Sequence, residues 1–141
     1  MKFFVIDASV AVKWYIPEPF SEQAVYYLEL LREGKAKLLA PELIIAELGN
    51  VLWKKELSGE LARDEIQLIG ETMANSFPAE LTEARLLLPA ALELALDLKL
   101  TVYDSLYLAL AIVKRATLVT ADKKLAKLAG AVLPGDIVTI G

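Results

Sequence analysis

The chain has 141 residues, a length that suits one domain with a well-buried core. It is 56% hydrophobic and 24% charged, with a formal net charge of −4, which is typical of a globular protein and excludes a disordered one. Cysteine and histidine are both absent, so disulfides, a thiolate nucleophile and the usual ligands of catalytic zinc are excluded. Any polar chemistry must come from carboxylates, hydroxyls, lysines or arginines.

The predicted elements alternate between short apolar runs and longer segments of helical periodicity. The predicted strands are Phe3–Ile6, Leu38–Ala40, Leu100–Tyr103, Leu118–Thr120 and Ile137–Ile140. The predicted helices are Ser9–Ile16, Ser21–Gly34, Pro41–Leu57, Ala62–Asn75, the residues after Pro89 up to Leu98, Ser105–Arg115 and Lys123–Ala129. Continuous apolar strands separated by helices indicate a parallel sheet covered on both faces. We therefore predict one α/β domain over residues 1–141, a three-layer α/β/α sandwich with a mainly parallel, roughly five-stranded sheet.

Neither a signal peptide nor a membrane span is predicted. The apolar start Phe3–Ile6 is too short for a signal peptide and ends at Asp7. The longest uncharged stretches, such as Ser105–Val113, fall well below the ~18 residues needed to cross a membrane. We expect a cytoplasmic protein without membrane association. The high apolar content further suggests surface intended for another chain, so we expect a homodimer or a higher oligomer.

Three aspartates follow predicted strands, where ligands bind in an open parallel sheet. Asp7 follows the first strand directly, Asp104 follows the third, and Asp122 lies just beyond Thr120 at the end of the fourth. Each aspartate also precedes a predicted helix, so each could simply be a helix N-cap. The two roles are compatible, and the predicted topology delivers all three carboxylates to one edge of the sheet.

Glu47 lies inside a predicted helix, where capping cannot explain it. On a helical wheel it falls between Leu43 and Val51, within the edge of the apolar stripe. A carboxylate there is costly unless it is paired or bound to a metal. The alternative is a glutamate that reaches solvent or pairs with Lys54 or Lys55. Four converging carboxylates would repel one another and raise their pKa values, and a divalent cation would relieve that conflict. Oxygen ligands without histidine or cysteine favour Mg²⁺ or Mn²⁺.

Four segments, taken in series, resemble the PIN domain, and most closely its VapC-type toxin ribonucleases. They are Val5-Ile6-Asp7-Ala8-Ser9-Val10, the Pro41–Leu48 segment with Glu47, Tyr103-Asp104-Ser105-Leu106-Tyr107-Leu108-Ala109, and Thr120-Ala121-Asp122. The resemblance covers essentially the whole chain, in order and with suitable spacing. It implies a single PIN-like nuclease domain that cuts RNA and is restrained by a cognate antitoxin protein.

The resemblance also assigns roles to residues. It makes Asp7, Glu47 and Asp104 the core ligands of Mg²⁺ or Mn²⁺, and Asp122 the fourth acid of the catalytic quartet. Thr120 matches the hydroxyl of a Thr-x-Asp motif, and Ser9 the small polar residue that follows the first aspartate. The implied mechanism is metal-assisted hydrolysis of an RNA phosphodiester bond.

Basic and apolar residues have more open roles. Lys13, and Lys123 or Lys124, could contact the RNA backbone, although each could equally be a solvated lysine. Apolar residues of the second and third helices should mostly be core, with some lining a groove for the antitoxin or a second copy. These residues are Tyr26, Tyr27, Leu30, Leu31, Val51, Leu52 and Trp53.

Two alternatives to a nuclease stay open. The first is a non-catalytic PIN-like binding module. The second is an aspartate-based phosphoryl-transfer domain. A phosphatase of the haloacid dehalogenase type would carry a second aspartate two residues after Asp7, where this chain has Ser9. A receiver domain would carry an acidic pair after the first strand and a lysine after the last, and neither is present.

Overall fold

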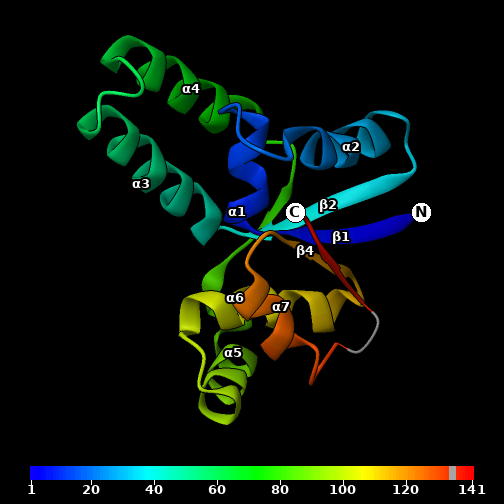
Figure 1. Cartoon of the computed structure of the whole chain (residues 1–141). Coiled ribbons are helices and arrows are strands. Elements are labelled where there is room, and N and C mark those ends of the chain that lie inside the picture. Colours follow the sequence, from blue (N-terminus) through cyan, green and yellow to red (C-terminus); the bar gives the residue numbers. More distant parts are fainter. Residues whose placement is uncertain (134–135) are drawn as a thin grey trace.

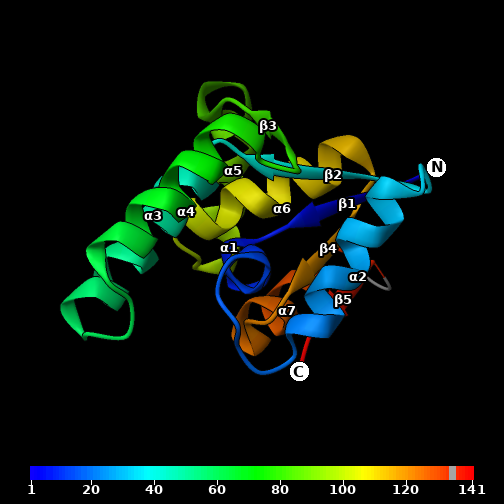
Figure 2. The same ribbon diagram turned by 90° about the horizontal axis from the view of Figure 1, so that it is seen from above.

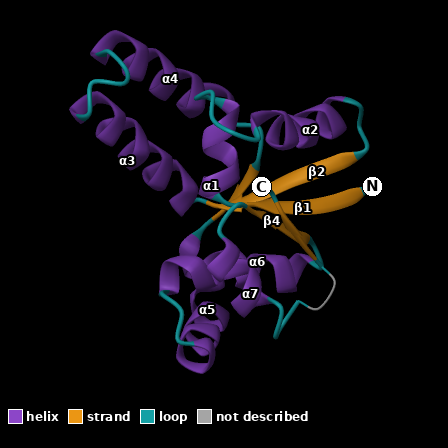
Figure 3. Cartoon of the chain, viewed as in Figure 1, coloured by secondary structure: helices purple, strands orange, loops and turns teal. Residues whose placement is uncertain are grey.

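A five-stranded sheet separates two layers of helices in the computed structural model, which describes residues 1–133 and 136–141 (Figure 1). The strands are β1 (Lys2–Ile6), β2 (Ala36–Pro41), β3 (Glu80–Thr82), β4 (Thr117–Thr120) and β5 (Ile137–Thr139). They are arranged in the order β3-β2-β1-β4-β5, and every neighbouring pair is parallel. The predicted three-layer α/β/α fold with a parallel sheet is confirmed (Figure 3).

The helices divide between the two faces of the sheet. They are α1 (Ala8–Ala11), which continues as the short 3-10 turn η1 (Val12–Trp14), α2 (Ser21–Arg32), α3 (Leu43–Leu57), α4 (Arg63–Ser76), α5 (Ala84–Leu98), α6 (Val102–Lys114) and α7 (Lys123–Ala129). Helices α1 to α4 lie on one face, and α5 to α7 on the other (Figure 1). Helices α3 and α4 run side by side and project beyond the sheet (Figure 2).

The core includes strands β1 and β4 and helix α6. Val5 and Ile6 of β1 and Leu118 and Val119 of β4 are fully buried. Seven consecutive residues of α6, from Ser105 to Ala111, are also buried, because this helix packs against β1, β2 and β4 while α5 covers its other side. A helix that is apolar all round is expected in such a place. The rigid centre of the sheet therefore also holds α6 in position.

The predicted strand Leu100–Tyr103 is wrong, because a helix begins there. The Thr101 side chain accepts a hydrogen bond from the backbone N–H of Asp104 at 3.1 Å, which makes Thr101 the N-cap of α6. Asp104 therefore lies in the first turn of α6 and neither follows a strand nor caps a helix. Short apolar runs such as this one fit a buried strand and a buried helix equally well.

The third strand along the chain is β3, which the sequence did not reveal. Its three residues pair with β2 at an edge of the sheet, and all three are at least partly exposed. An edge strand this short carries no apolar run that periodicity could detect.

Helix α5 begins earlier than predicted, at Ala84, and Pro89 lies inside it. Proline lacks an N–H group, so the helix loses one backbone hydrogen bond there without ending.

Two further helix boundaries differ in detail. Pro41 is the last residue of β2 and not the start of the following helix, which begins at Leu43. Helix α2 ends at Arg32, and Gly34 adopts the left-handed φ of 72° expected just beyond a helix end. Among the residues that the structure describes, no helix is both long enough and apolar enough to cross a bilayer.

Candidate active site

Asp7 is the most buried carboxylate at the carboxyl edge of the sheet. It follows β1 directly, is 5% exposed and forms the N-cap of α1, as expected. Its Oδ1 accepts hydrogen bonds from the Ser9 hydroxyl at 2.5 Å and from the backbone N–H of Val10 at 3.3 Å. Its Oδ2 accepts a short hydrogen bond from the Thr120 hydroxyl. Both oxygens are therefore held in place by donors.

Ser9 and Thr120 connect Asp7 to the end of β4. The Ser9 hydroxyl accepts from the backbone N–H of Ala121 at 2.9 Å, and the Thr120 hydroxyl accepts from that of Asp122 at 3.0 Å. Each hydroxyl thus receives one hydrogen bond from the chain after β4 and donates one to Asp7. The structure brings both predicted hydroxyl residues into contact with the first aspartate.

Burial raises the pKa of Asp7 from 3.8 to about 6. The hydrogen bonds from Ser9, Thr120 and Val10 lower this pKa, and the negative charge of Asp122 raises it further. The site thus holds a carboxyl group whose ionised form is destabilised by its surroundings. A nearby cation would favour the ionised form.

Glu47 is half-buried on α3 and binds neither of the lysines considered as its partners. Its Oε1 accepts a 2.5 Å hydrogen bond from the Tyr107 hydroxyl of α6, and Lys55 binds Glu60 instead at 2.8 Å. Burial raises the pKa of Glu47, the hydrogen bond from Tyr107 lowers it, and the charge of Asp104 raises it. Glu47 therefore faces the other acids.

Tyr107 is a site residue that was not predicted, although it lies in one of the segments that resemble the PIN domain. It is 2% exposed, and burial followed by its hydrogen bond to Glu47 raises the pKa of its phenol well above the ordinary value. It stands three residues after Asp104 on α6, a spacing that places both on one face of a helix. That spacing was the signal that could have identified it.

Asp104 and Asp122 approach each other from α6 and α7. Burial raises the pKa of Asp104, and the charge of Asp122 raises it further, while hydrogen bonding with Thr101 and the charge of Lys124 lower it. Asp122 is exposed and caps α7, accepting from the backbone N–H groups of Lys124 at 3.0 Å and Leu125 at 3.1 Å. Both aspartates line a cavity of about 100 Å³.

The four acids form a chain of electrostatic neighbours. The pairs Asp7–Asp122, Asp122–Asp104 and Asp104–Glu47 each raise a carboxyl pKa. Within residues 1–133 and 136–141, however, no three acidic side chains are already grouped tightly enough to hold a metal ion. The structure brings the acids to one edge, with Asp7 and Glu47 turned towards hydroxyl donors.

Lys13, the basic residue suggested as a substrate contact, is engaged within the chain. Its Nζ lies 3.2 Å from Oε1 of Glu18, and its side chain is only 10% exposed. A half-buried ion pair of this kind holds the loop after η1 and leaves little of the ammonium group for a ligand.

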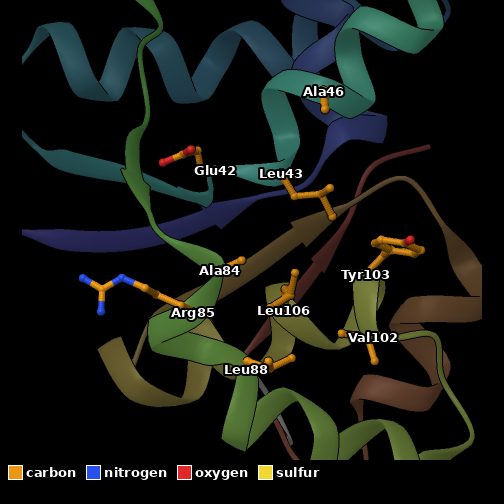
Figure 4. A pocket seen from close by; sticks show the side chains of 9 residues that line it. All are labelled: Glu42, Leu43, Ala46, Ala84, Arg85, Leu88, Val102, Tyr103 and Leu106. Atoms are coloured by element: carbon orange, nitrogen blue, oxygen red, sulfur yellow. The ribbon is translucent and has the colours of Figure 1, made fainter.

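An apolar groove of about 550 Å³ opens between α3, α5 and α6. Figure 4 shows Leu43, Leu88 and Leu106 lining its middle, with Glu42 and Arg85 at one end and Tyr103 at the other. Tyr103 is 62% exposed and Leu88 41%, so apolar surface is open to contact here. Two of the residues predicted to line a groove on the second and third helices, Leu52 and Trp53, line a separate hollow between α3 and α4.

Comparison with known proteins identifies the family. The PIN domain model matches residues 4–131. Ribonuclease VapC3 from Pyrobaculum aerophilum is 36% identical over 124 residues, which are 87% of this chain and 92% of that protein.

Two crystal structures share the fold. PAE2754 from Pyrobaculum aerophilum matches with a TM-score of 0.69 and 24% identity over 96% of this chain and 83% of that one. VapBC2 from Rickettsia felis, bound to a DNA fragment from their promoter, matches with a TM-score of 0.66 and 20% identity over 89% of this chain and 91% of that one. The predicted resemblance is confirmed: this chain belongs to the PIN-domain family and is similar within it to the VapC-type proteins.

Proposed function

We propose that this chain is a divalent-metal-dependent endoribonuclease and the toxin of a toxin–antitoxin pair. The observation that carries the proposal is the row of four acids at the carboxyl edge of the sheet, three of which have raised pKa values through burial and mutual charge. The similarity to Ribonuclease VapC3 supports RNA as the substrate, which would place the activity in the cytoplasm.

The donor chemistry of the site fits Mg²⁺ or Mn²⁺. The chain offers only oxygen ligands there, because it has no histidine or cysteine. Asp7, Glu47 and Asp104 would hold the ion, with Asp122 contributing from the more exposed side. A bound divalent ion supplies Lewis acidity, which polarises a phosphate oxygen and acidifies water.

Hydrogen bonds from the surrounding residues orient two of the acids for ion binding. Ser9 and Thr120 fix both oxygens of Asp7, and Tyr107 fixes one oxygen of Glu47. Such hydrogen bonds from neighbouring groups orient ligands and tune their basicity. They also leave the second oxygen of Glu47 available to an ion or a water molecule.

The central test compares acid-to-amide variants. Asp104→Asn and Glu47→Gln should abolish RNA cleavage in Mn²⁺ while leaving the thermal unfolding temperature close to that of the wild type. Asp97→Asn, which neutralises an exposed acid of α5, serves as the control and should cleave normally. Full cleavage by the wild type in EDTA would contradict the metal-dependent mechanism. Mn²⁺-dependent RNA binding without cleavage would instead favour the non-catalytic binding module.

The partner of the proposed toxin is an antitoxin, and the apolar groove offers surface for it. Leu88 and the aromatic ring of Tyr103 are exposed there, so they offer apolar contact area to a partner chain. Co-expression with a small protein encoded beside this chain should yield a stable complex without RNA cleavage. Light scattering of the isolated chain tests the expected homodimer or higher oligomer, which a purely monomeric protein would contradict.

A further inference from the structure

Ion pairs and position along the fold divide the basic side chains of the protein into groups. The chain has 15 lysines and arginines. Over residues 1–133 and 136–141, ion pairs engage Lys13, Lys35, Lys37, Lys55 and Arg85. Of the other basic residues in these two ranges, only Lys99 and Lys124 line the cavity that Asp104 and Asp122 also line.

The two lysines approach this cavity from different elements. Lys99 follows the last residue of α5, and Lys124 lies in the first turn of α7. The positive charge of Lys124 lowers the pKa of Asp104, so the two groups are within electrostatic reach of each other. Yet neither lysine forms an ion pair within the described part of the chain. Both lysines therefore line the cavity of the proposed metal-binding acids Asp104 and Asp122 without being committed to an ion pair in the described part of the chain.

We propose that Lys99 and Lys124 form a phosphate subsite that binds the RNA backbone next to the scissile bond. The inference rests on the proposed nuclease function and names the residues that hold its substrate. The cavity, at about 100 Å³, has room for roughly three water molecules, so it would admit a phosphate group and not a whole nucleotide.

The charge of the chain explains why such a subsite is needed. With a net charge of −4 and four acids at the site, a polyanion is repelled unless local cations compensate. Lysine ammonium groups bind backbone phosphates without reading the base, and each contact steepens the salt dependence of binding. Lys99 and Lys124 would supply this compensation where the substrate must come closest to the carboxylates.

A lysine at position 99 could also be explained by its place at the end of a helix. Arg115 provides a control for this explanation, because it occupies the equivalent place at the end of α6. Lys99 adopts a left-handed conformation (φ 57°) just after α5, and Arg115 does the same (φ 51°) just after α6. A cation at a helix C-terminus is favoured by the helix dipole in both places. Only Lys99 lines the cavity, whereas Arg115 lies at the far end of α6, about 20 Å away for a helix of this length.

The matched variants Lys99→Gly and Arg115→Gly remove one charge each at equivalent backbone positions. Lys99→Gly should raise KM for RNA cleavage several-fold with little change in kcat, and Arg115→Gly should not. The slope of log(kcat/KM) against log[salt] should become shallower by about 0.7 in Lys99→Gly, the value for one lost contact to a single strand. Lys124→Gln should behave in the same way, with Lys127→Gln of the same short helix as its control.

Calorimetric titration of Mn²⁺ separates this subsite from a structural role. Removing a cation beside the acids should leave Mn²⁺ affinity unchanged or tighter in Lys99→Gly. Weaker Mn²⁺ binding that parallels the rise in KM would overturn the subsite, as would equal KM values for Lys99→Gly and Arg115→Gly. A wild-type chain that binds Mn²⁺ but leaves RNA intact would refute the proposed function together with the subsite.

Discussion

The Tyr107 hydroxyl of α6 donates a 2.5 Å hydrogen bond to Oε1 of Glu47 on α3, although the two residues are 60 positions apart. Tyr107 is almost completely buried, whereas Glu47 is half-buried, so the tyrosine anchors the glutamate from the inside of the protein. The bond links a helix from each face of the sheet across its carboxyl edge. The position of Glu47 is consequently set by α6 as well as by its own helix.

Tyr107→Phe should weaken Mn²⁺ binding by about tenfold, because groups that orient a metal ligand typically contribute 10- to 100-fold to affinity. The loss of a partner for a half-buried carboxylate should also lower the free energy of unfolding by about 1–3 kcal/mol. Calorimetric titration and urea unfolding measure the two effects. The control is Tyr103→Phe, an exposed tyrosine of the same helix. Unchanged Mn²⁺ affinity in Tyr107→Phe would show that Glu47 does not depend on this bond.

Asp7→Asn should stabilise the metal-free protein at pH 7 while abolishing cleavage. The pKa of Asp7 is about 6 in the folded protein, against an ordinary value of 3.8, so folding favours its protonated form. The stability that this group contributes is fully present below pH 3.8 and is lost as the pH rises through 6. The loss amounts to no more than about 3 kcal/mol.

Urea unfolding in EDTA at several pH values measures this effect. Between pH 4 and 7 the wild type should lose more unfolding free energy than Asp7→Asn, and the variant should be the more stable at pH 7. Equal pH profiles for the two proteins would mean that Asp7 titrates normally. With Mn²⁺ present the order should reverse, because the ion binds the ionised carboxylate only.

Thr120→Val tests the hydroxyl that joins Asp7 to the end of β4. Valine has a similar shape but neither donates to Asp7 nor accepts from the backbone N–H of Asp122. Since Thr120 is fully buried, two groups lose a partner away from water, and the free energy of unfolding should fall by about 2–4 kcal/mol. Thr139→Val on the exposed strand β5 is the matched change and should cost less than about 0.5 kcal/mol. Similar thermal unfolding temperatures for the two variants would contradict the role of this hydroxyl.

The helical register of α6 can be tested by core truncation. Leu110→Ala removes a fully buried side chain and should lower the free energy of unfolding by about 2–5 kcal/mol. Val113→Ala, on the exposed side of the same helix, should have an effect below about 0.5 kcal/mol. The reverse order in urea unfolding would show that the helix packs on a different face.

The sequence predicted the four acids and their common edge more securely than the elements that carry them. Asp7 and Asp122 follow β1 and β4 as expected, because buried central strands have strong apolar runs. Asp104 reaches the same edge by another route, in the first turn of α6. Its neighbours, Leu100 to Tyr103, are apolar enough for either a strand or a helix, and only the Thr101 cap decides between them.

Glu47 and Tyr107 show which features of the site a sequence pattern can predict and which it cannot. The helical wheel placed Glu47 at the apolar edge of α3, and that burial is what the structure has. The wheel could not identify its partner, because Tyr107 belongs to a helix on the opposite face of the sheet. Contacts of this kind depend on how elements pack, and no local pattern encodes them. The edge strand β3 was not predicted for a related reason. It is a strand because it pairs with β2, and not because of its own composition.

The hydroxyl bridges from Ser9 and Thr120 to Asp7 have a consequence for protein synthesis. The bond from Thr120 to Asp7 joins positions 113 apart, at nearly opposite ends of the chain, and β4 must pair with β1 before it can form. A nascent chain that has not yet emerged from the ribosome past residue 120 has Asp7 and Glu47 but no Thr120 or Asp122 to complete the site. Under the proposed function, an incomplete chain would lack the complete site needed to cleave RNA, including the messenger from which it is being translated.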